Sequence, residues 1–232
     1  MASPQAGPYA LRRLKAVRMS RLAEDGSPIC DTVDGSAWSP CPQSITPATN
    51  TTAEQTSELR CGDGSIADQD ITPGVVSSFT VTLVIAKQDF ELVVLATGAT
   101  PIFDPSDPTR VIGFLDPAID ETAPPVELNV WGQNRDNSAN ASSPYQFQRI
   151  VFPYVRFRLG DDALGEEYSV VTLVGTATPN NAIGGGVFDD YPVDASGRAR
   201  LRWATDIIPS ALVSPYSANP TGGFLDTPPC LS

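Results

Sequence analysis

The stretch VSSFTVTLVIAKQDFELVVLATG, residues 76–98, decides the fold. Between Ser78 and Ile85 apolar side chains alternate with smaller or hydroxyl-bearing ones, a period of two that is typical of a strand with one buried face. Asp89 follows and can cap the first amides of a helix. Apolar residues then recur three and four apart as far as Gly98, which can adopt the left-handed conformation that ends a helix. The stretch predicts one strand followed by a helix of about two turns that covers the open end of a β-sandwich.

The composition indicates a mainly β chain. The 232 residues are 41% hydrophobic, which suffices for a sizeable core, but 22 prolines and 18 glycines interrupt the chain and disfavour long helices. The formal net charge of −12 argues against general binding to nucleic acids or to anionic membranes. We expect a single β domain over residues 1–208 and an extended C-terminal tail, rich in Pro, Ser and Gly, over residues 209–232.

Other alternating stretches predict the remaining strands of this domain. They are residues 11–22, 110–114, 126–131, 150–159, 167–176 and 198–203. Between them, residues 100–107 are expected to form a loop because they are rich in proline and aspartate. Residues 26–58 contain few large apolar side chains apart from Trp38, and we expect them to form a long arm loop inserted into the domain.

Charge is unevenly distributed along the chain. Residues 11–22 carry five of the fifteen basic side chains, whereas residues 26–74 hold seven acids and one arginine, a net charge of −6. A basic group of this size on an acidic protein suggests a surface that meets an acidic partner.

The sequence offers little for catalysis or for metal binding. It contains no histidine, which excludes a Ser-His-Asp or Cys-His arrangement, and no P-loop, dinucleotide fingerprint or G-x-S-x-G motif. The four cysteines lack the spacing of a zinc site; we expect free thiols in a cytoplasm, with a Cys30–Cys41 disulfide as the alternative outside a cell. Adjacent carboxylates at 161–162, 166–167 and 189–190 fit solvated turns better than a glycosidase pair. We expect no enzymatic activity, no metal and no cofactor.

The sequence shows no targeting or membrane segment. Residues 1–15 lack a continuous apolar core and a cleavage site. No run approaches the roughly 20 apolar residues that a membrane span needs. We expect a protein that is made in a cytoplasm and has no membrane partner.

The order of these parts resembles the major tail tube proteins of long-tailed phages that infect actinobacteria. The segments that carry the resemblance are RRLKAVRMSRL (12–22), DGSPI (25–29), the strand before D-x-E-L-x-x-L-x-T-G (89–98), VELNVWGQN (126–134), FPYVRFRLGD (152–161) and YSVVTLVGTATPNN (168–181). The most specific of them is the strand followed by the motif at 89–98. The resemblance covers about residues 11–190.

The resemblance implies a tail-tube-type β-sandwich or barrel with one short flanking helix and a long arm, in a virion protein that forms stacked hexameric rings. The stack would be a hollow conduit for double-stranded DNA in the tail of a virion assembled in the host cytoplasm. Tape measure protein and viral DNA would pass through the lumen, and tail terminator and tail tip proteins would bind the ends. An acidic lumen would repel DNA and let it slide. The candidate residues are Arg12, Arg13, Arg18 and Trp38 for contacts between subunits, and Glu58, Asp63, Asp68 and Asp70 for the lumen.

Two other classes of function stay open at this point. One is another virion part, such as a tail terminator, a hub or a capsid decoration protein. The other is a carbohydrate-binding or hydrolytic β-sandwich module, which would need an exposed cluster of aromatic side chains. Only Trp38, Trp131 and Trp203 are available as tryptophans for such a cluster. Assembly into rings or tubes would separate the virion proteins from a monomeric module.

Overall fold

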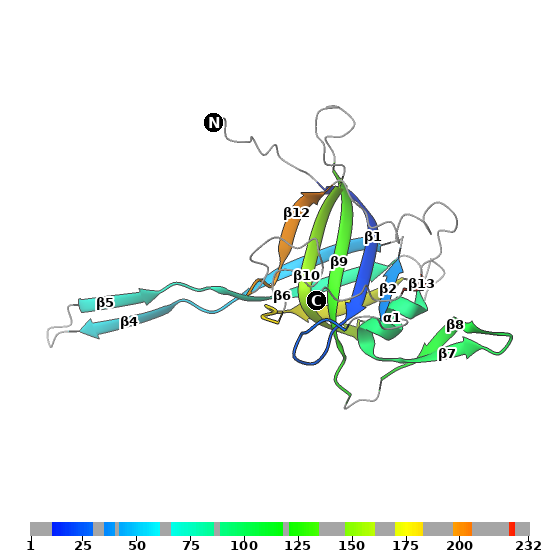
Figure 1. The fold of residues 1–232 in the computed structure, drawn as a ribbon. Coiled ribbons are helices and arrows are strands. Elements are labelled where there is room, and N and C mark those ends of the chain that lie inside the picture. The colour runs from blue at the N-terminus through cyan, green and yellow to red at the C-terminus, as the bar shows by residue number, and fades with distance from the viewer. Residues whose placement is uncertain are drawn as a thin grey trace.

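A computed structural model describes residues 11–29, 35–39, 42–60, 66–85, 89–117, 121–134, 147–160, 170–182, 197–205 and 223–225. These residues form a mainly β fold of antiparallel strands with one short helix (Figure 1). The predicted mainly β class with one flanking helix is therefore confirmed. Within the described residues the main sheet is open and does not close into a barrel.

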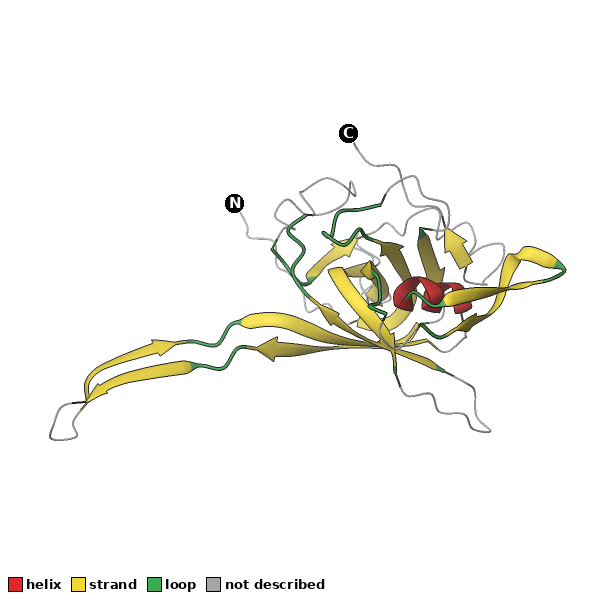
Figure 2. Cartoon of the chain, turned by 90° about the horizontal axis from the view of Figure 1, so that it is seen from below, coloured by secondary structure: helices red, strands yellow, loops and turns green. Residues whose placement is uncertain are grey.

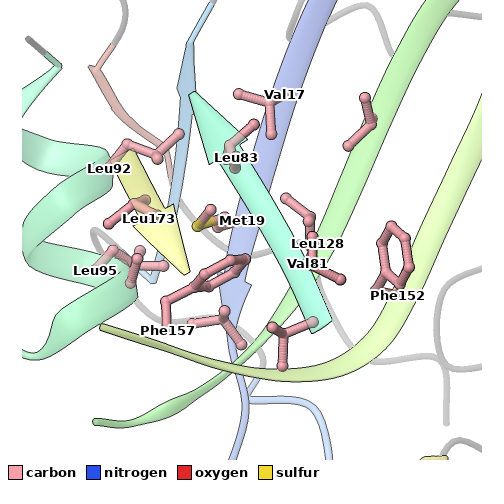
Figure 3. Close-up of a cluster of buried hydrophobic side chains, with 14 of the residues drawn as sticks. Val17, Met19, Val81, Leu83, Leu92, Leu95, Leu128, Phe152, Phe157 and Leu173 are labelled. Atoms are coloured by element: carbon pink, nitrogen blue, oxygen red, sulfur yellow. The ribbon is translucent and has the colours of Figure 1, made fainter. Parts of the chain in front are cut away.

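The main sheet has nine of the described strands. Their order is β13 (Gly223–Leu225), β2 (Ser36–Ser39), β1 (Leu11–Arg21), β9 (Pro125–Asn134), β10 (Phe147–Leu159), β11 (Val171–Ala177), β6 (Val76–Ile85) and β3 (Pro42–Thr51), with β12 (Leu201–Thr205) paired to β10. The first part of β10 pairs with β12 and its last part with β11. An irregularity opposite β9, between Phe152 and Val155, separates the two parts. Such a bulge bends a strand, and β10 curves so that β6 crosses in front of β1 and β9 (Figure 3).

The strand and helix predicted over residues 76–98 are confirmed. The apolar face of β6 is buried, at Phe79, Val81, Leu83 and Ile85. The helix α1 (Phe90–Thr97) ends at Gly98, whose φ of 77° is left-handed. The predicted cap is wrong, because the side chain of Asp89 makes no hydrogen bond to the first helical amides. Its carboxylate instead accepts a hydrogen bond from Ser39 Oγ and ties the start of the helix to β2.

Helix α1 covers one end of the core. Leu92 and Leu95 point from the helix toward Met19, Phe157 and Leu173, which come from three strands (Figure 3). Each of these side chains is fully or almost fully buried, and full burial of one such side chain stabilises a fold by about 1.5–3 kcal/mol. The core therefore connects β1, β10 and β11 to the helix.

The prediction that residues 26–58 form a coreless arm loop is wrong. This segment contains β2, β3 and the first strand of a hairpin, β4 (Gln55–Arg60). It contains few apolar residues because β3 is an edge strand with much of its surface in water, at Gln43, Thr46, Ala48 and Thr49. The part that projects is the hairpin of β4 and β5 (Ile66–Thr72), which extends away from the body (Figures 1 and 2).

Residues 100–107 are not a loop but part of a second hairpin. It is formed by β7 (Thr100–Asp104) and β8 (Asp107–Leu115) and stands apart from the β4–β5 hairpin (Figure 1). Phe114 packs edge-to-face on Phe90 with the ring centroids 6.0 Å apart, which attaches the hairpin to α1. The turn lies at the tip of this hairpin, where Ser106 N donates a 2.8 Å hydrogen bond to Asp104 Oδ1.

The other predicted strands are observed with shifted ends. Residues 11–22, 126–131, 150–159 and 198–203 correspond to β1, β9, β10 and β12. The strand predicted over 167–176 is β11, and residues 167–169 lie outside the described ranges. In the C-terminal segment, which was expected to be an extended tail, residues 223–225 form β13 and pair with β2.

Candidate assembly surfaces

The β4–β5 hairpin is the first candidate surface. At its base Thr52 N donates a 2.9 Å hydrogen bond to the Val75 carbonyl, and Val75 N donates a 3.0 Å bond to Thr52 Oγ1. These bonds continue the β3–β6 pairing outward, so the hairpin is anchored in the main sheet. An isolated two-stranded hairpin is marginally stable in water, and a partner that covers one face would stabilise it.

The predicted lumen residues lie on this hairpin. Glu58 is exposed on β4. Asp68 and Asp70 lie on β5, where they pair in register with Leu59 and Ser57. Asp63 lies outside the described ranges. Residues 52–75 contain five acids and one arginine, a net charge of −4, so the negative charge is concentrated on the segment that projects most.

Exposed apolar side chains gather on the two hairpins. Among the described residues, the large apolar side chains with high exposure are Ile71, Val75, Val76, Ile102, Phe103, Ile112 and Leu115, all 41–61% exposed. The first three lie at the base of the β4–β5 hairpin and the other four on the β7–β8 hairpin. The hairpin is covered in part, since Val111, the cross-strand partner of Phe103, is buried. These residues were not predicted from the sequence, although the adjacent apolar pair Ile102 and Phe103 in a proline-rich and aspartate-rich segment indicated them.

The three arginines predicted to contact a neighbouring subunit lie in different surroundings. Arg12 and Arg13 are at the start of β1, and their side chains are outside the described part. Arg18 is in the middle of β1, between Trp38 of β2 and Asn129 of β9. It is only partly exposed, and its Nε is buried with no hydrogen-bond acceptor among the described residues. Arg18 is therefore not a simple surface charge.

Trp38 is not on the surface. It is 2% exposed and packs with Ala16 and Trp131 in a small cluster separate from the main core. This burial corrects the prediction that its side chain contacts a neighbouring subunit. Trp38 is the largest apolar side chain of the segment that was expected to be an arm, whereas all four residues of β2 are buried.

A buried polar network lies next to this tryptophan pair. Arg149 donates from Nε and Nη2 to Asn129 Oδ1 over 2.9 and 2.7 Å, and Asn129 Nδ2 donates to the carboxylate of Glu127. The Arg149 guanidinium also lies 5.3 Å from the ring centroid of Trp131. Removing Asn129 from this network would be destabilising, because a buried polar group that loses its hydrogen-bond partner costs about 1–3 kcal/mol. In the sequence, the one sign of this network is the alternation of Glu127 and Asn129 with valine and leucine in VELNVW.

A second polar group stabilises the lower end of the sheet. Arg156 Nη2 forms a 2.6 Å ion pair with Glu24 and a 2.8 Å hydrogen bond with Tyr154 Oη, while Nη1 donates to the Ala123 carbonyl. Burial alone would lower the pKa of Arg156, but hydrogen bonds to Glu24 and Tyr154 raise it above its ordinary value. These contacts join the turn after β1 to β10 and serve structure rather than chemistry.

The described residues provide neither a metal-binding cluster nor a membrane span. No group of three histidine, cysteine, aspartate or glutamate side chains in the described ranges could hold a metal ion. In the same ranges no helix is long and apolar enough to cross a membrane. The four cysteines and the three pairs of adjacent carboxylates lie outside the described residues, as does the side chain of Trp203.

A comparison with known proteins finds no family model that matches this chain and no curated protein with a similar sequence.

Proposed function

We propose that this chain is a structural virion protein of the tail tube type, which assembles with copies of itself into stacked hexameric rings. The observation that carries the proposal is the β4–β5 hairpin, a two-stranded extension of the sheet that reaches beyond the body of the subunit (Figure 2). Such an arm presents both of its faces and an apolar base to its surroundings. A neighbouring copy that covers the arm would bury these side chains and link the subunits.

The open edge of β3 supports the same proposal. Among the described strands β3 is hydrogen-bonded to β6 alone, which makes its other edge a candidate for pairing with a strand of a neighbouring copy. Edge strands of this kind either aggregate or are matched to a partner. Pro42 and Pro47 lack an N–H and restrict which register a partner strand could adopt. Contacts that close head-to-tail by rotation would produce a ring.

The charge of the chain is compatible with a DNA conduit. Double-stranded DNA carries about one negative charge per 1.7 Å of axis, so an acidic wall repels it. In the proposed assembly the arm acids that are not paired with β1 of a neighbour line the bore, with Glu58, Asp63, Asp68 and Asp70 as the candidates, and viral DNA and the tape measure protein occupy the lumen. Tail terminator and tail tip proteins would cap the two ends.

The tryptophans count against a carbohydrate-binding module. Such a module stacks sugars on exposed aromatic rings, but Trp38 and Trp131 are buried in the fold. Another virion part, such as a tail terminator, would form a single ring that does not stack. The β4–β5 arm would then have no second ring to contact.

Electron microscopy of the purified chain tests the proposal. Negative-stain images over a range of concentrations, with sedimentation velocity in the same buffers, should show rings with six-fold class averages that stack into tubes. Single rings that never stack would favour a terminator or hub instead. A monomer at every concentration, under conditions in which virions assemble, would contradict both.

A further inference from the structure

The two groups of exposed apolar side chains lie on opposite sides of the body. Val75 and Val76 are at the base of the β4–β5 hairpin, and the other group is on the β7–β8 hairpin. In both views these two hairpins extend in opposite directions (Figures 1 and 2). Exposed apolar groups of this kind mark interaction sites. One subunit does not bring its two groups together, so a contact between them requires two molecules.

The β7–β8 hairpin presents an apolar face that points away from the body. Ile102 pairs with Gly113, and Leu115 pairs with Thr100. Because cross-strand partners share a face and neighbours along a strand alternate, Ile102 and Leu115 lie opposite Phe114, whose ring packs on α1. A Cβ on Gly113 would meet only the Ile102 side chain, at 3.8 Å. The glycine therefore leaves the surface beside Ile102 free of bulk.

Carboxylates flank this apolar face. Asp104 and Asp107 pair in register at the tip of the hairpin, and Asp116 is exposed directly after Leu115. Residues 104–121 contain five acids, and Arg110 is their only basic residue, which gives a net charge of −4. The β7–β8 side of the subunit is therefore both apolar and acidic.

Three arginines lie near the other apolar group. Arg198, Arg200 and Arg202 stand at the start of β12 and are exposed. The Arg200 guanidinium lies 4.5 Å from the ring centroid of Phe79 on β6, and Phe79 is three residues, or about 10 Å, from Val76. Within the described part of the chain none of the three arginines has an ion pair or a side-chain hydrogen bond.

The arginines are close enough to repel each other. Burial and, after it, the nearby charge of Arg202 lower the pKa of Arg200 below its ordinary value. Residues 197–205 contain no acid, so they carry a charge of +3 in a chain of net charge −12. Carboxylates from a partner would remove the repulsion between the like charges. This side of the subunit is therefore apolar and basic, which complements the β7–β8 side.

We infer that the β7–β8 hairpin of one copy docks beside the base of the β4–β5 hairpin of the next copy. The apolar face with Ile102 and Leu115 packs on Val75 and Val76, and the flanking carboxylates pair with the arginines of β12. This contact rests on the proposed function and deepens it. A contact between two different sides repeats head-to-tail and closes by rotation into a ring, which leaves the projecting part of the β4–β5 hairpin for the next ring.

Reversal of charge on one side at a time tests the contact. Arg200→Asp with Arg202→Asp should raise the protein concentration for half-maximal assembly by about ten-fold or more at low salt. Asp107→Arg with Asp116→Arg should have the same effect. The chain with all four changes should assemble like the parent, because the attraction then acts with opposite signs. Arg158→Asp, at an exposed arginine of β10, is the control and should leave assembly unchanged.

Two outcomes of this experiment would overturn the inference. One is unchanged assembly of either reversed chain. The other is a combined chain that keeps the β-sheet circular dichroism of the parent but does not recover assembly.

Photo-crosslinking covers the case in which a reversed chain fails to fold. A photo-crosslinking amino acid at position 102 or 115 of the otherwise unaltered chain should react with residues 75–79 or 198–202 of another molecule. Mass spectrometry of a mixture of isotope-labelled and unlabelled chains separates these crosslinks from those within one molecule. Rings or tubes whose crosslinks map elsewhere would overturn the contact and leave the proposed function in place. A chain that stays monomeric at every concentration would contradict both.

Discussion

The side-chain amide of Asn180 donates a 2.8 Å hydrogen bond to the carbonyl oxygen of Gly26 and thereby joins the turn after β1 to the chain that leaves β11. The same nitrogen donates over 3.2 Å to the Pro153 carbonyl, at the irregularity of β10. Gly26 has a φ of 85°, and a Cβ at this position would lie 2.5 Å from Asn180 Oδ1. One buried amide therefore fixes three segments that are far apart in sequence.

Replacing this amide should destabilise the fold. Asn180→Ala leaves the carbonyls of Gly26 and Pro153 without their donor, and a buried polar group without a partner costs about 1–3 kcal/mol. Urea denaturation should show that loss in the free energy of unfolding. Asn181→Ala is the matched control, because Asn181 is exposed and a surface change stays within about 0.5 kcal/mol. Equal stability of both variants would show that the amide is not a structural link.

Asp25 in the same turn should titrate at an unusually low pH. Its carboxylate accepts hydrogen bonds from the Ser27 hydroxyl and backbone amide over 2.6 and 2.9 Å, which lower the pKa of Asp25 below its ordinary value of 3.8. These hydrogen bonds therefore stabilise the fold fully above pH 3.8. Their stabilisation is lost as the pH falls through the pKa that Asp25 has in the folded state, which lies below 3.8. NMR titration should find this lowered pKa, and Ser27→Ala should raise it.

The control for this titration is the turn at the tip of the β7–β8 hairpin. Hydrogen bonds from Ser106 likewise lower the pKa of Asp104. Ser106→Ala should therefore raise the pKa of Asp104 and leave that of Asp25 in place. If Ser27→Ala left the Asp25 titration unchanged, the hydrogen bonds would not be the cause of the low pKa.

The strand and helix of residues 76–98 could be predicted because each buries one face and leaves the other in water. Their apolar residues then recur with a clear period, and Gly98 marks the end of the helix. The same logic fails for β3, since an edge strand with a mostly wet surface has too few apolar residues to show a period. It also fails for the β7–β8 hairpin, where prolines lie at strand positions that need no ladder donor.

The candidate surfaces could be predicted only in part. The negative charge of residues 52–75 could be predicted from the sequence. The position of these acids on a hairpin could not, because it depends on the pairing of β4 with β5. The burial of Glu127 and Asn129 could not be predicted, because β9 is buried on both sides and these two residues occupy positions that look exposed in an alternating strand. Trp38 was misplaced for the same reason.

Removing the arm should separate folding from assembly. Thr52 and Val75 face each other at the base of the hairpin, so residues 53–74 can be replaced by an Asn-Gly turn that suits a two-residue hairpin. We expect the shortened chain to fold with its core intact and to form no stacked tubes in electron micrographs. By contrast, deleting residues 32–53 removes β2 and β3 together with Trp38 and should prevent folding. Full-length tubes from the shortened chain would contradict the role of the arm.

The exposed apolar side chains of the β7–β8 hairpin should matter for assembly but not for folding. In the double variant Phe103→Ser with Ile112→Ser, two exposed apolar side chains become polar. The free energy of unfolding should change little, because single exposed changes typically stay within about 0.5 kcal/mol. Sedimentation should show weaker assembly. Val111→Ser, at the buried cross-strand partner of Phe103, is the control, and its buried hydroxyl should cost about 1–3 kcal/mol of stability. Unchanged assembly of the double variant would exclude this hairpin from the subunit contacts.

Charge complementarity between β1 and the arm leads to a salt-dependent prediction. Five basic residues lie within residues 11–22, and residues 52–75 have a net charge of −4. An exposed ion pair contributes only about 0–1 kcal/mol, but a ring repeats each contact at every interface. Arg12→Glu with Arg13→Glu should therefore weaken assembly strongly at low salt and little at high salt, since the screening length falls from about 10 Å at 0.1 M to about 3 Å at 1 M. Light scattering over a salt series measures the difference.

Two further variants distinguish a docking contact from a loss of folding. Arg18→Glu is kept out of the pair because the Nε of Arg18 is buried in the main sheet, so adding this change should lower the free energy of unfolding as well as assembly. Reversing the arm in Glu58→Arg with Asp68→Arg and Asp70→Arg should restore low-salt assembly of the Arg12→Glu, Arg13→Glu chain, because attraction then acts with opposite signs. If the arm reversal alone leaves assembly intact and does not rescue the β1 variant, the start of β1 is only a solvated strand end and the arm binds elsewhere.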